Sequence, residues 1–425
     1  MLDSTRTAVA GTLNNRVFYG WVMVSVAALG LFASGPGQSH TFSVFNDLIA
    51  RDLGISLEAV TWAYGADTVL AAFLLPIMGR QVDRFGARRS LIGIAGGLGL
   101  ACIAFGAVAG MLWLVIGFAA LRFLGQGSMM LGSANLVAQW FTAKRGFAMS
   151  LMALGFALSI AIHPKLGQLL IDLYDWRTAW IALGIMTWVM MLPVLVLIVF
   201  DRPSALGLYP DNAPPAEGET APELTGPELG EALRHPSFYL ICAVWFGLSA
   251  LVTSLHFHQV NIMTFQGLAA DRATDSFVFS SIAMVCLMPL VGRACDRFRT
   301  RYVVLAALIV QSSSLIAVTQ VDSVPTMFVY AALFGLNNAF TMTLFGYVWP
   351  RYFGRKHLGR IQGTGQMVAV IGASIGPIPV SRAFDASGDP STVIWWLATY
   401  PIVIGVLAVL FLRTHPKVQG TEHLE

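Results

Sequence analysis

Between two long apolar runs, the chain carries the stretch GRQVDRFGARR (79–89), in which a glycine is followed by an Asp-Arg pair and two closing arginines. A related stretch, GRACDRFRTR (292–301), recurs at an offset of 213 residues and keeps the glycine, the Asp-Arg-Phe and a final arginine. Further landmarks keep this offset within one residue: Phe141 with Phe353, Lys144 with Lys356, Pro164 with Pro377, and Asp172 with Asp385. The repeat predicts two halves built on one plan.

The composition of the chain lies outside the range of soluble proteins. Of its 425 residues, 56% are hydrophobic and only 12% are charged, and the mean hydropathy is +0.68. A membrane-spanning helix needs roughly 20 apolar residues. Such runs occur near residues 18–45, 57–79, 90–109, 112–137, 146–171, 177–200, 237–263, 274–292, 302–320, 325–348, 359–383 and 391–412. We therefore predict an all-α membrane protein with twelve transmembrane helices in two pseudo-symmetric six-helix bundles.

A polar segment separates the two halves. Residues 201–235 contain six prolines and seven acidic residues, which is the composition of a solvated linker. The predicted parts are a cytoplasmic N-terminus (1–17), an N-terminal six-helix bundle (18–200), a cytoplasmic linker (201–236), a C-terminal six-helix bundle (237–412) and a cytoplasmic C-terminus (413–425).

Lysine and arginine set the predicted orientation. With both termini inside, the inner segments hold 20 of the 26 Lys and Arg residues, whereas the outer loops hold three, Arg51, Arg177 and Arg272. Cytoplasmic loops carry the excess of positive charge in membrane proteins. We therefore predict that both termini lie in the cytoplasm, with the protein in a bacterial-type inner membrane.

The sequence argues against several classes of function. The net charge is only +3 and the basic residues form short clusters between apolar runs, so nucleic acid is not an expected partner. The four cysteines form no close pair, so no metal centre is expected. A phosphate-binding loop of the G-x-x-x-x-G-K-[ST] kind is absent, so ATP is not expected to drive the protein. A receptor would add a signalling domain and an enzyme a tight catalytic constellation, and the sequence has neither.

The pattern G-x-x-x-D-R-x-G-x-R-R at 79–89, with its partial repeat, resembles the signature loop of the major facilitator superfamily, and the resemblance covers the whole chain. Arg122, with Gly125, Gln126 and Gly127, is similar to a second signature of that superfamily, in incomplete form. The resemblance implies a central cavity that opens alternately to each side of the membrane. It also implies that spans 1, 4, 7 and 10 line this cavity.

A narrower resemblance rests on three motifs. Tyr19-Gly20-Trp21, HTFSVF (40–45) and W-F-x-x-K-R-G-x-A (140–148) are similar to the monocarboxylate transporter family and its bacterial oxalate-exchanger relatives. That family implies a small organic anion carried with a proton or exchanged for another anion. The family's basic residue in span 8 falls on Met288 and that of span 1 on His40. A counter-charge for an anion must therefore come from elsewhere.

Ionisable side chains inside spans are functional candidates, because each costs at least ~2.5 kcal/mol to insert. Arg122, near the middle of span 4, could bind a carboxylate or couple protons, or it could tie span 4 to its neighbours. Lys165, just after His163, could replace the missing cation, or its long stem could reach the outer interface. Arg382 lies near the outer end of span 11, where an interfacial role is the alternative. The predicted substrate contacts are His40, Arg122, His163, Lys165, His258, Asn337 and Arg382.

Proton coupling has three candidates. Asp67 is the only carboxylate well inside a span of the first half, and a buried carboxylate can take up and release a proton. Arg122 could tune such an acid, and His256 in span 7 could carry a proton near neutral pH. Hydrogen bonds between helices are the alternative role for each. His256 and His258 should point in different directions, because they are two residues apart on a helix.

The repeated loops are candidates for gating. In such a loop a glycine lets the chain turn tightly, and Asp83 can accept hydrogen bonds from the N-terminus of a nearby helix. The superfamily resemblance implies that the cluster holds the halves together when the cavity faces outward. The usual excess of positive charge in cytoplasmic loops would explain the arginines of both loops. It would not explain why each loop also carries an aspartate, Asp83 in the first and Asp296 in the second. The predicted gating residues are Asp83, Arg84, Arg88, Asp296, Arg297 and Arg301.

Together these features predict a secondary active transporter of small organic acid anions, such as mono- or aromatic carboxylates, working by proton-coupled symport. The alternatives are an anion exchanger of the oxalate type and an efflux pump for amphipathic compounds. No catalytic residue and no cofactor are expected, with the proton gradient as the energy source. The expected partners are the anion, the proton and membrane lipids, and the protein is expected to be a monomer.

Overall fold

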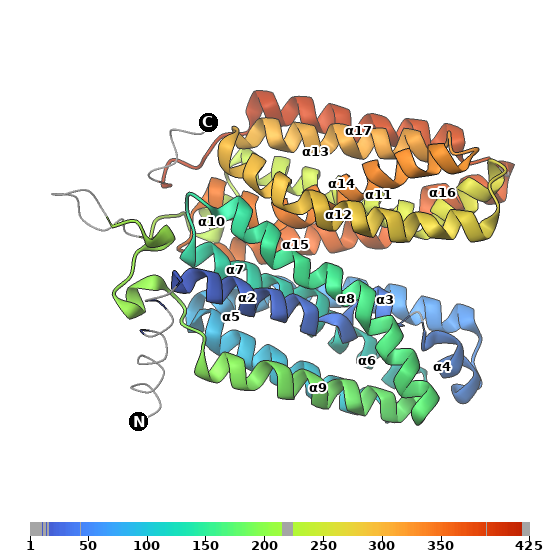
Figure 1. Cartoon of the computed structure of the whole chain (residues 1–425), viewed down its shortest axis with the longest axis horizontal. Helices are drawn as coiled ribbons and strands as arrows, with labels where there is room; N and C mark the ends of the chain where they lie inside the picture. The colour runs from blue at the N-terminus through green and yellow to red at the C-terminus, as the bar shows by residue number, and fades with distance from the viewer. Residues whose placement is uncertain are drawn as a thin grey trace. The chain divides into compact units, whose positions relative to one another are not determined.

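The computed structural model describes residues 11, 14, 17–42, 44–214, 224–387 and 389–418. Within these ranges, the side chains outside the description are those at positions 47, 57, 58, 61, 62, 64–67, 270, 271, 274, 385 and 387. The described part is helical throughout and contains no strand (Figure 1). Ten of its helices are long and apolar enough to cross a membrane. Helices are expected in a lipid bilayer, because a helix pairs its backbone N–H and C=O groups with one another.

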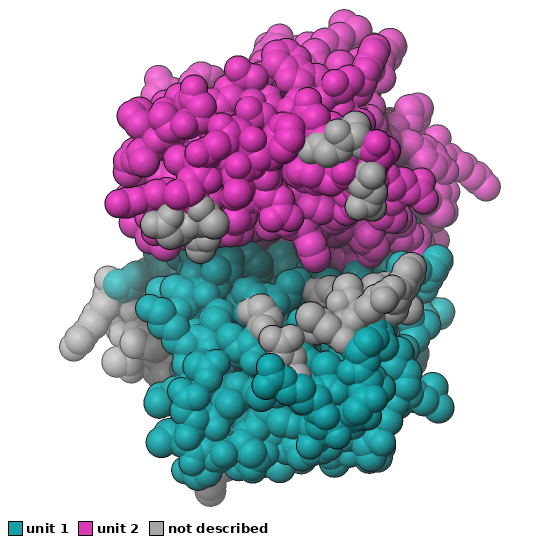
Figure 2. Space-filling view, turned by 90° about the vertical axis from the view of Figure 1, so that its right-hand side faces the viewer, with its two compact units in different colours: residues 1–224, 355–364 teal, residues 225–354, 365–425 magenta. Residues whose placement is uncertain are grey.

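Contacts within the chain divide it into two compact units (Figure 2). Unit 1 comprises Met1–Leu224 and Arg355–Thr364, and unit 2 comprises Thr225–Gly354 and Gly365–Glu425. The helices of the first half are α2 (Tyr19–Ala33), η1 (Gly35–Gly37), α3 (Ser39–Phe42), α4 (Asn46–Leu53), α5 (Leu57–Phe105), α6 (Met111–Leu121), η2 (Arg122–Met129), α7 (Met130–Trp140), α8 (Arg145–Leu173), α9 (Trp176–Leu197), η3 (Pro203–Leu206) and η4 (Pro210–Asn212). Those of the second half are α10 (Leu229–Ala232), α11 (Pro236–Phe265), α12 (Ala270–Arg297), α13 (Thr300–Val318), α14 (Val324–Phe353), α15 (Leu358–Ile375), α16 (Ile378–Ser387) and α17 (Ser391–Phe411).

Each unit has an aromatic centre. In unit 1, the ring centroids of Phe45 and Phe105 lie 4.9 Å and 4.7 Å from that of Trp180, and all three side chains are fully buried. This contact joins α9 to α5 and to the residue that precedes α4. In unit 2, the rings of Tyr330 and Phe334 stack at 5.5 Å within α14. Such pairs add roughly 0.5–1.5 kcal/mol beyond the burial of apolar area.

The first three predicted spans do not form three separate continuous helices. The Gly-Pro-Gly sequence at 35–37 breaks the first span, because proline cannot continue the helical hydrogen bonding: α2 ends after 15 residues and η1 follows. Spans 2 and 3 are joined within α5, where only Gly86 is non-helical, with φ 83° and ψ 164°. Gly86 is therefore the residue that turns the chain, because a side chain is strained at positive φ. These two features explain why the described part does not show twelve separate long helices.

The start of the predicted linker makes specific contacts. The side chain of Asp211 accepts hydrogen bonds from the backbone N–H groups of Thr142, Ala143 and Lys144, at 2.7, 2.7 and 3.2 Å. These donors precede α8, so the carboxylate stabilises the start of that helix. Residues 201–214 are thus attached to unit 1 rather than merely solvated, whereas 215–223 lie outside the described residues.

Candidate functional site

Arg122 begins a π-helical segment in the middle of the fourth span. The segment, η2, lies between α6 and α7, and such local widening of a helix often occurs at functional sites. The Arg122 side chain is only 6% exposed. Its Nη1 donates a hydrogen bond to Ser39 Oγ at 3.0 Å, so the buried cation lies at the start of α3.

Two glycines allow η1 and η2 to touch through their backbones. A Cβ added to Gly37 would lie 2.2 Å from the carbonyl oxygen of Leu121, and one added to Gly125 would lie 2.8 Å from the Cα of Gly37. Real side chains do not tolerate such distances, so only glycine fits at either position. This close approach brings the break in the first span next to Arg122.

Two histidines and a serine form a chain of polar contacts beside α3. His40 Nε2 lies 3.1 Å from Ser159 Oγ, and Ser159 Oγ lies 3.1 Å from His163 Nδ1. Ser159 and His163 are 0% and 4% exposed, and the His163 ring packs at 4.7 Å from that of Phe32. Because Ser39 and His40 are adjacent, Arg122 and this chain form one polar cluster in unit 1.

The other candidates of the first half lie elsewhere or outside the description. Lys165 is exposed, and it lies two residues after the buried His163 on α8. Side chains two apart on a helix point in nearly opposite directions, so the structure does not bring Lys165 and His163 together. Asp67 lies in α5, but its side chain is outside the described residues.

Unit 2 holds the remaining polar candidates. His258 Nε2 donates to the carbonyl oxygen of Pro377 at 3.1 Å and lies 3.2 Å from Ser381 Oγ. His256 Nδ1 donates instead to the carbonyl of Val252 at 2.9 Å, so the two histidines face different neighbours, as the sequence predicts. Arg382 is exposed on α16.

Asn337 is an unusual group within α14. Its side chain is 0% exposed, and neither its Oδ1 nor its Nδ2 has a hydrogen-bond partner among the described residues. Leaving such a buried group unsatisfied costs about 1–3 kcal/mol, and buried polar groups are rarely left so. An amide in this state can accept and donate hydrogen bonds to a bound solute or water.

Asp83 caps the N-terminus of α15 within unit 1, as the sequence predicts for a nearby helix. Its Oδ1 and Oδ2 accept hydrogen bonds from the backbone N–H groups of Gly359 and Arg360 at 2.7 and 2.8 Å. A Cβ on Gly79 would lie 2.0 Å from the carbonyl oxygen of Gly359, so the first glycine of the loop permits this approach. The carboxylate satisfies backbone donors that have no partner within the helix.

The arginines of the two loops have different surroundings. Arg88 donates through Nη2 to Val196 and through Nε to Leu195, carbonyls at the end of α9, at 2.7 and 3.3 Å. Arg84 lies over the ring of Phe85, with 5.1 Å between its Cζ and the ring centroid. In unit 2, Asp296 is partly buried and Arg297 exposed at the end of α12, and Arg301 lies over the ring of its neighbour Tyr302 at 5.2 Å.

The sequence of the chain matches the model of the Major Facilitator Superfamily over residues 27–270 and 264–424. The chain belongs to the major facilitator superfamily. Members of this superfamily are multi-pass membrane transporters of small molecules, so a transporter rather than an enzyme is established at the level of the family. The family resemblance drawn from the signature loops and the all-α fold are both confirmed.

Individual superfamily members show what the chain is similar to. It is 25% identical to the uncharacterized MFS-type transporter YhjX of Escherichia coli over 80% of this chain and 82% of that protein. It is 25% identical to the oxalate:formate antiporter of Oxalobacter formigenes over 69% and 67% of the two chains. The multidrug efflux pump LfrA of Mycolicibacterium smegmatis is 30% identical over 42% and 34%. The human organic anion transporter MFSD10 (TETRAN) has the same fold, with a TM-score of 0.67, 15% identity and coverage of 91% of this chain and 98% of that one.

Sequence reasoning missed two residues of the Arg122 cluster and one residue beside the signature loop. Ser39 and Ser159 connect Arg122, His40 and His163, and a serine four residues before a histidine in a span is a readable signal. Asp201 accepts a hydrogen bond from the backbone N–H of Arg88 at 2.7 Å, and no pattern in the sequence indicates this contact. Among the described residues, no group of three or more His, Cys, Asp or Glu could hold a metal ion.

We expect Asp83→Ala to loosen the start of α15. Loss of a capping side chain costs about 0.5–2 kcal/mol, so amide exchange at Gly359 and Arg360 should become roughly 2- to 30-fold faster. Hydrogen–deuterium exchange with mass spectrometry measures this. Asp296→Ala, the matched change in the repeated loop, should leave those amides unchanged. Equal exchange in Asp83→Ala and wild type would contradict the capping role.

Proposed function

We propose that this protein is a secondary active transporter that carries a small organic acid anion together with a proton across a bacterial-type inner membrane, with both termini in the cytoplasm. The observation that supports this most strongly is the polar cluster in which the exposed Ser39 and the partly buried His40 connect the buried side chains of Arg122, Ser159 and His163. The substrates that fit it best are mono- and aromatic carboxylates. Transport proceeds by alternating access, without covalent chemistry.

Arg122 suits the recognition of a carboxylate. Its planar guanidinium presents N–H donors in a fork that matches two carboxylate oxygens, and its Nη1 donates to Ser39. A cation held in a span is costly, so its retention is best explained by a partner of opposite charge. The Oγ of Ser39 beside it can bind a second oxygen of the same anion.

The histidine chain suits the coupling to protons. Imidazole is the side chain that most readily changes its protonation near neutral pH. His40 is adjacent to Ser39 and shares Ser159 with His163, so a proton taken up by either ring lies close to the proposed carboxylate site. A proton and an anion that bind together cross the membrane with no net charge.

Relatives support this proposal and two alternatives. The similarity to an oxalate:formate antiporter favours an organic anion as substrate and keeps anion exchange as the second mechanism to test. The similarity to a multidrug efflux pump extends over 42% of this chain. It favours export of amphipathic compounds as the second candidate function.

Uptake into proteoliposomes tests the proposal. Labelled lactate, benzoate, formate and oxalate are offered with and without an inward proton gradient, and with and without oxalate inside. For electroneutral symport, a gradient of one pH unit should accumulate the substrate about tenfold. Uptake that requires oxalate inside the liposomes and does not depend on the proton gradient would show anion exchange instead of proton-coupled symport. No uptake of any carboxylate by folded protein would overturn the anion proposal and favour efflux.

A further inference from the structure

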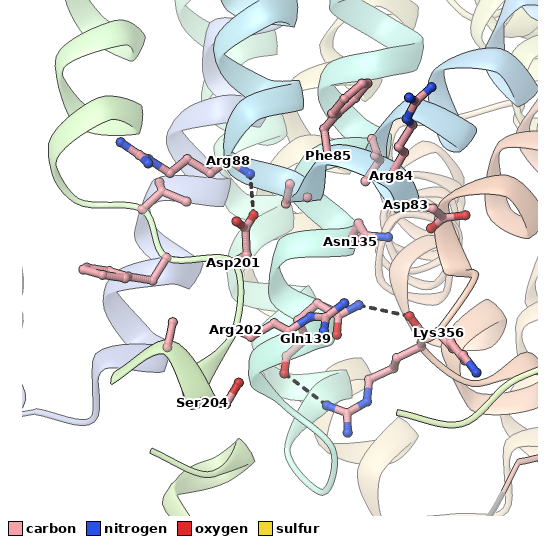
Figure 3. A pocket seen from close by; sticks show the side chains of 17 residues that line it. Asp83, Arg84, Phe85, Arg88, Asn135, Gln139, Asp201, Arg202, Ser204 and Lys356 are labelled. Carbon is pink, nitrogen blue, oxygen red and sulfur yellow. Dashed lines mark hydrogen bonds between the residues drawn. The ribbon is translucent and has the colours of Figure 1, made fainter. Parts of the chain in front are cut away.

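A cavity of about 580 Å³ lies in unit 1 beside the signature loop (Figure 3). Four segments form it: residues 82–88 of α5, the end of α7, residues 199–205, and Arg355 with Lys356. All four belong to unit 1. The charge distribution of the sequence predicts that this end of the unit faces the cytoplasm. The sequence gives no sign of the cavity, because its walls are far apart along the chain.

The cavity is lined by more positive than negative groups. Its cations are Arg84, Arg88, Arg202, Arg355 and Lys356, and its carboxylates are Asp83 and Asp201. Both carboxylates are already acceptors for backbone N–H groups, Asp83 at the start of α15 and Asp201 at Arg88. An excess of positive charge therefore remains for a ligand.

The cations differ in how far their donors are already used. Arg88 is bound to carbonyls at the end of α9, and one nitrogen of Arg355 donates to the carbonyl of Gln139 at 3.0 Å. Arg84, Arg202 and Lys356 are exposed, and their side chains have no hydrogen bond or ion pair with the described residues. Loss of Arg202 or Lys356 would therefore break no hydrogen bond or ion pair among the described residues, and the charged ends of all three side chains can turn to a bound anion.

Buried amides line the inner wall of the cavity. Asn135 and Gln139 are 5% and 7% exposed. Gln139 Nε2 donates to the carbonyl of Arg355 at 3.1 Å, whereas its Oε1 has no partner among the described residues. That oxygen can accept a hydrogen bond from a ligand that carries an O–H group beside its negative charge. Protonated phosphate and phosphate esters with hydroxyl groups have this combination.

The electrostatics of Arg355 support an anion site in the cavity. Burial lowers the pKa of its guanidinium, and the nearby positive charge of Arg202 lowers it further, although Asp211 acts in the opposite direction. Asp211 is itself held by the backbone donors before α8. An anion between Arg202 and Arg355 would remove their repulsion.

We propose that this cavity binds a phosphate group, which is either inorganic phosphate from the cytoplasm or the headgroup of an anionic lipid. Arginine forks and lysine together are the common means of binding phosphate in proteins, and basic pockets at this end of membrane helices bind lipid headgroups. The cavity volume exceeds that of a single phosphate and leaves room for an attached glycerol or sugar. Binding does not depend on the transported substrate.

The bound phosphate holds the start of α15 in place. It joins Arg202, which follows α9, to Arg355 and Lys356, which directly precede the helix capped by Asp83. A phosphate bound in the cavity therefore stabilises the N-terminus of α15, which the Asp83 cap also stabilises. The measurable result is slower amide exchange in the segment 355–361 whenever the site is filled.

The test uses the full chain in nanodiscs. In discs of phosphatidylcholine, inorganic phosphate is added at constant ionic strength with chloride as the control, and binding is followed by calorimetry and by amide exchange at 355–361. A second set of discs contains phosphatidylglycerol and no added phosphate. Protection by phosphate identifies the free anion as the ligand, and protection in the second discs alone identifies the lipid.

Matched variants distinguish phosphate binding in this cavity from non-specific attraction of phosphate to basic residues. Arg202→Gln and Lys356→Gln should each weaken phosphate binding by about tenfold or more, because each removes a charge-assisted hydrogen bond. Arg89→Gln changes the same charge at an exposed arginine of the same loop outside the cavity, and it should bind like wild type. Melting temperature and gel filtration verify that each variant is folded. Absence of binding and protection in both discs, or an equal loss in Arg89→Gln, would overturn the proposal.

Discussion

Neutralising Arg122 should remove carboxylate transport while leaving the protein folded. In Arg122→Gln, uptake at low substrate concentration should fall at least about 100-fold, which corresponds to roughly 2.7 kcal/mol of lost binding. That magnitude is within the cost of removing one member of a buried charge pair. The physical reason is that the substrate carboxylate would enter a buried site that lacks its counter-charge. Initial rates of proton-driven benzoate or lactate uptake measure the effect.

Two further variants make the Arg122 result specific. Arg122→Lys keeps the charge but loses the planar fork, so uptake should fall by only about tenfold. Arg51→Gln removes the same charge from an exposed position at the end of α4 and should transport normally. If Arg122→Gln melts like wild type and still accumulates carboxylate, then Arg122 only ties helices together. Retained export of an amphipathic dye in that variant would favour the efflux alternative.

The sequence predicts the parts of this fold that depend on local pattern. Apolar runs locate the helices, and the Gly-Pro-Gly at 35–37 locates the break in the first span. Asp83 was expected to accept hydrogen bonds from a helix N-terminus, and it does so at Gly359 and Arg360. This succeeds because a partly buried carboxylate beside a chain turn has few other ways to satisfy its charge.

Features that depend on contacts between distant segments were not predictable. The polar residues after Gly79 suggested a loop, but polar side chains are compatible with a helix that extends beyond the membrane, and α5 turns only at Gly86. The π-helix at Arg122 leaves no mark in the hydrophobic pattern. The pairing of Ser39 with Arg122, and the docking of Asp211 before α8, become visible only when the helices are packed.

Enlarging Gly125 should damage transport more than stability. In Gly125→Ala, the new methyl would lie 2.8 Å from Gly37 Cα and 2.9 Å from the carbonyl oxygen of Ser34, so η1 must move away from η2. Overpacking of this kind costs about 1–3 kcal/mol. Because Ser39 is only two residues beyond Gly37, the same movement separates it from Arg122. Uptake should therefore fall by more than tenfold, with a raised KM, while the melting temperature drops by a few degrees.

The control for this prediction lies on α5 in the same unit. A Cβ on Gly93 would meet no atom within 4 Å, and alanine in a helix is favoured over glycine by roughly 0.5–1 kcal/mol. Gly93→Ala should therefore transport like wild type and melt at the same or a higher temperature. If Gly125→Ala also transported normally, a small shift of η1 would be tolerated and the Ser39–Arg122 contact could not be part of the binding site. If both uptake and folding were lost, Gly125→Ser would add a similar volume together with a hydroxyl able to donate to the Ser34 carbonyl. Recovery of folding without uptake in that variant would assign the close approach to transport itself.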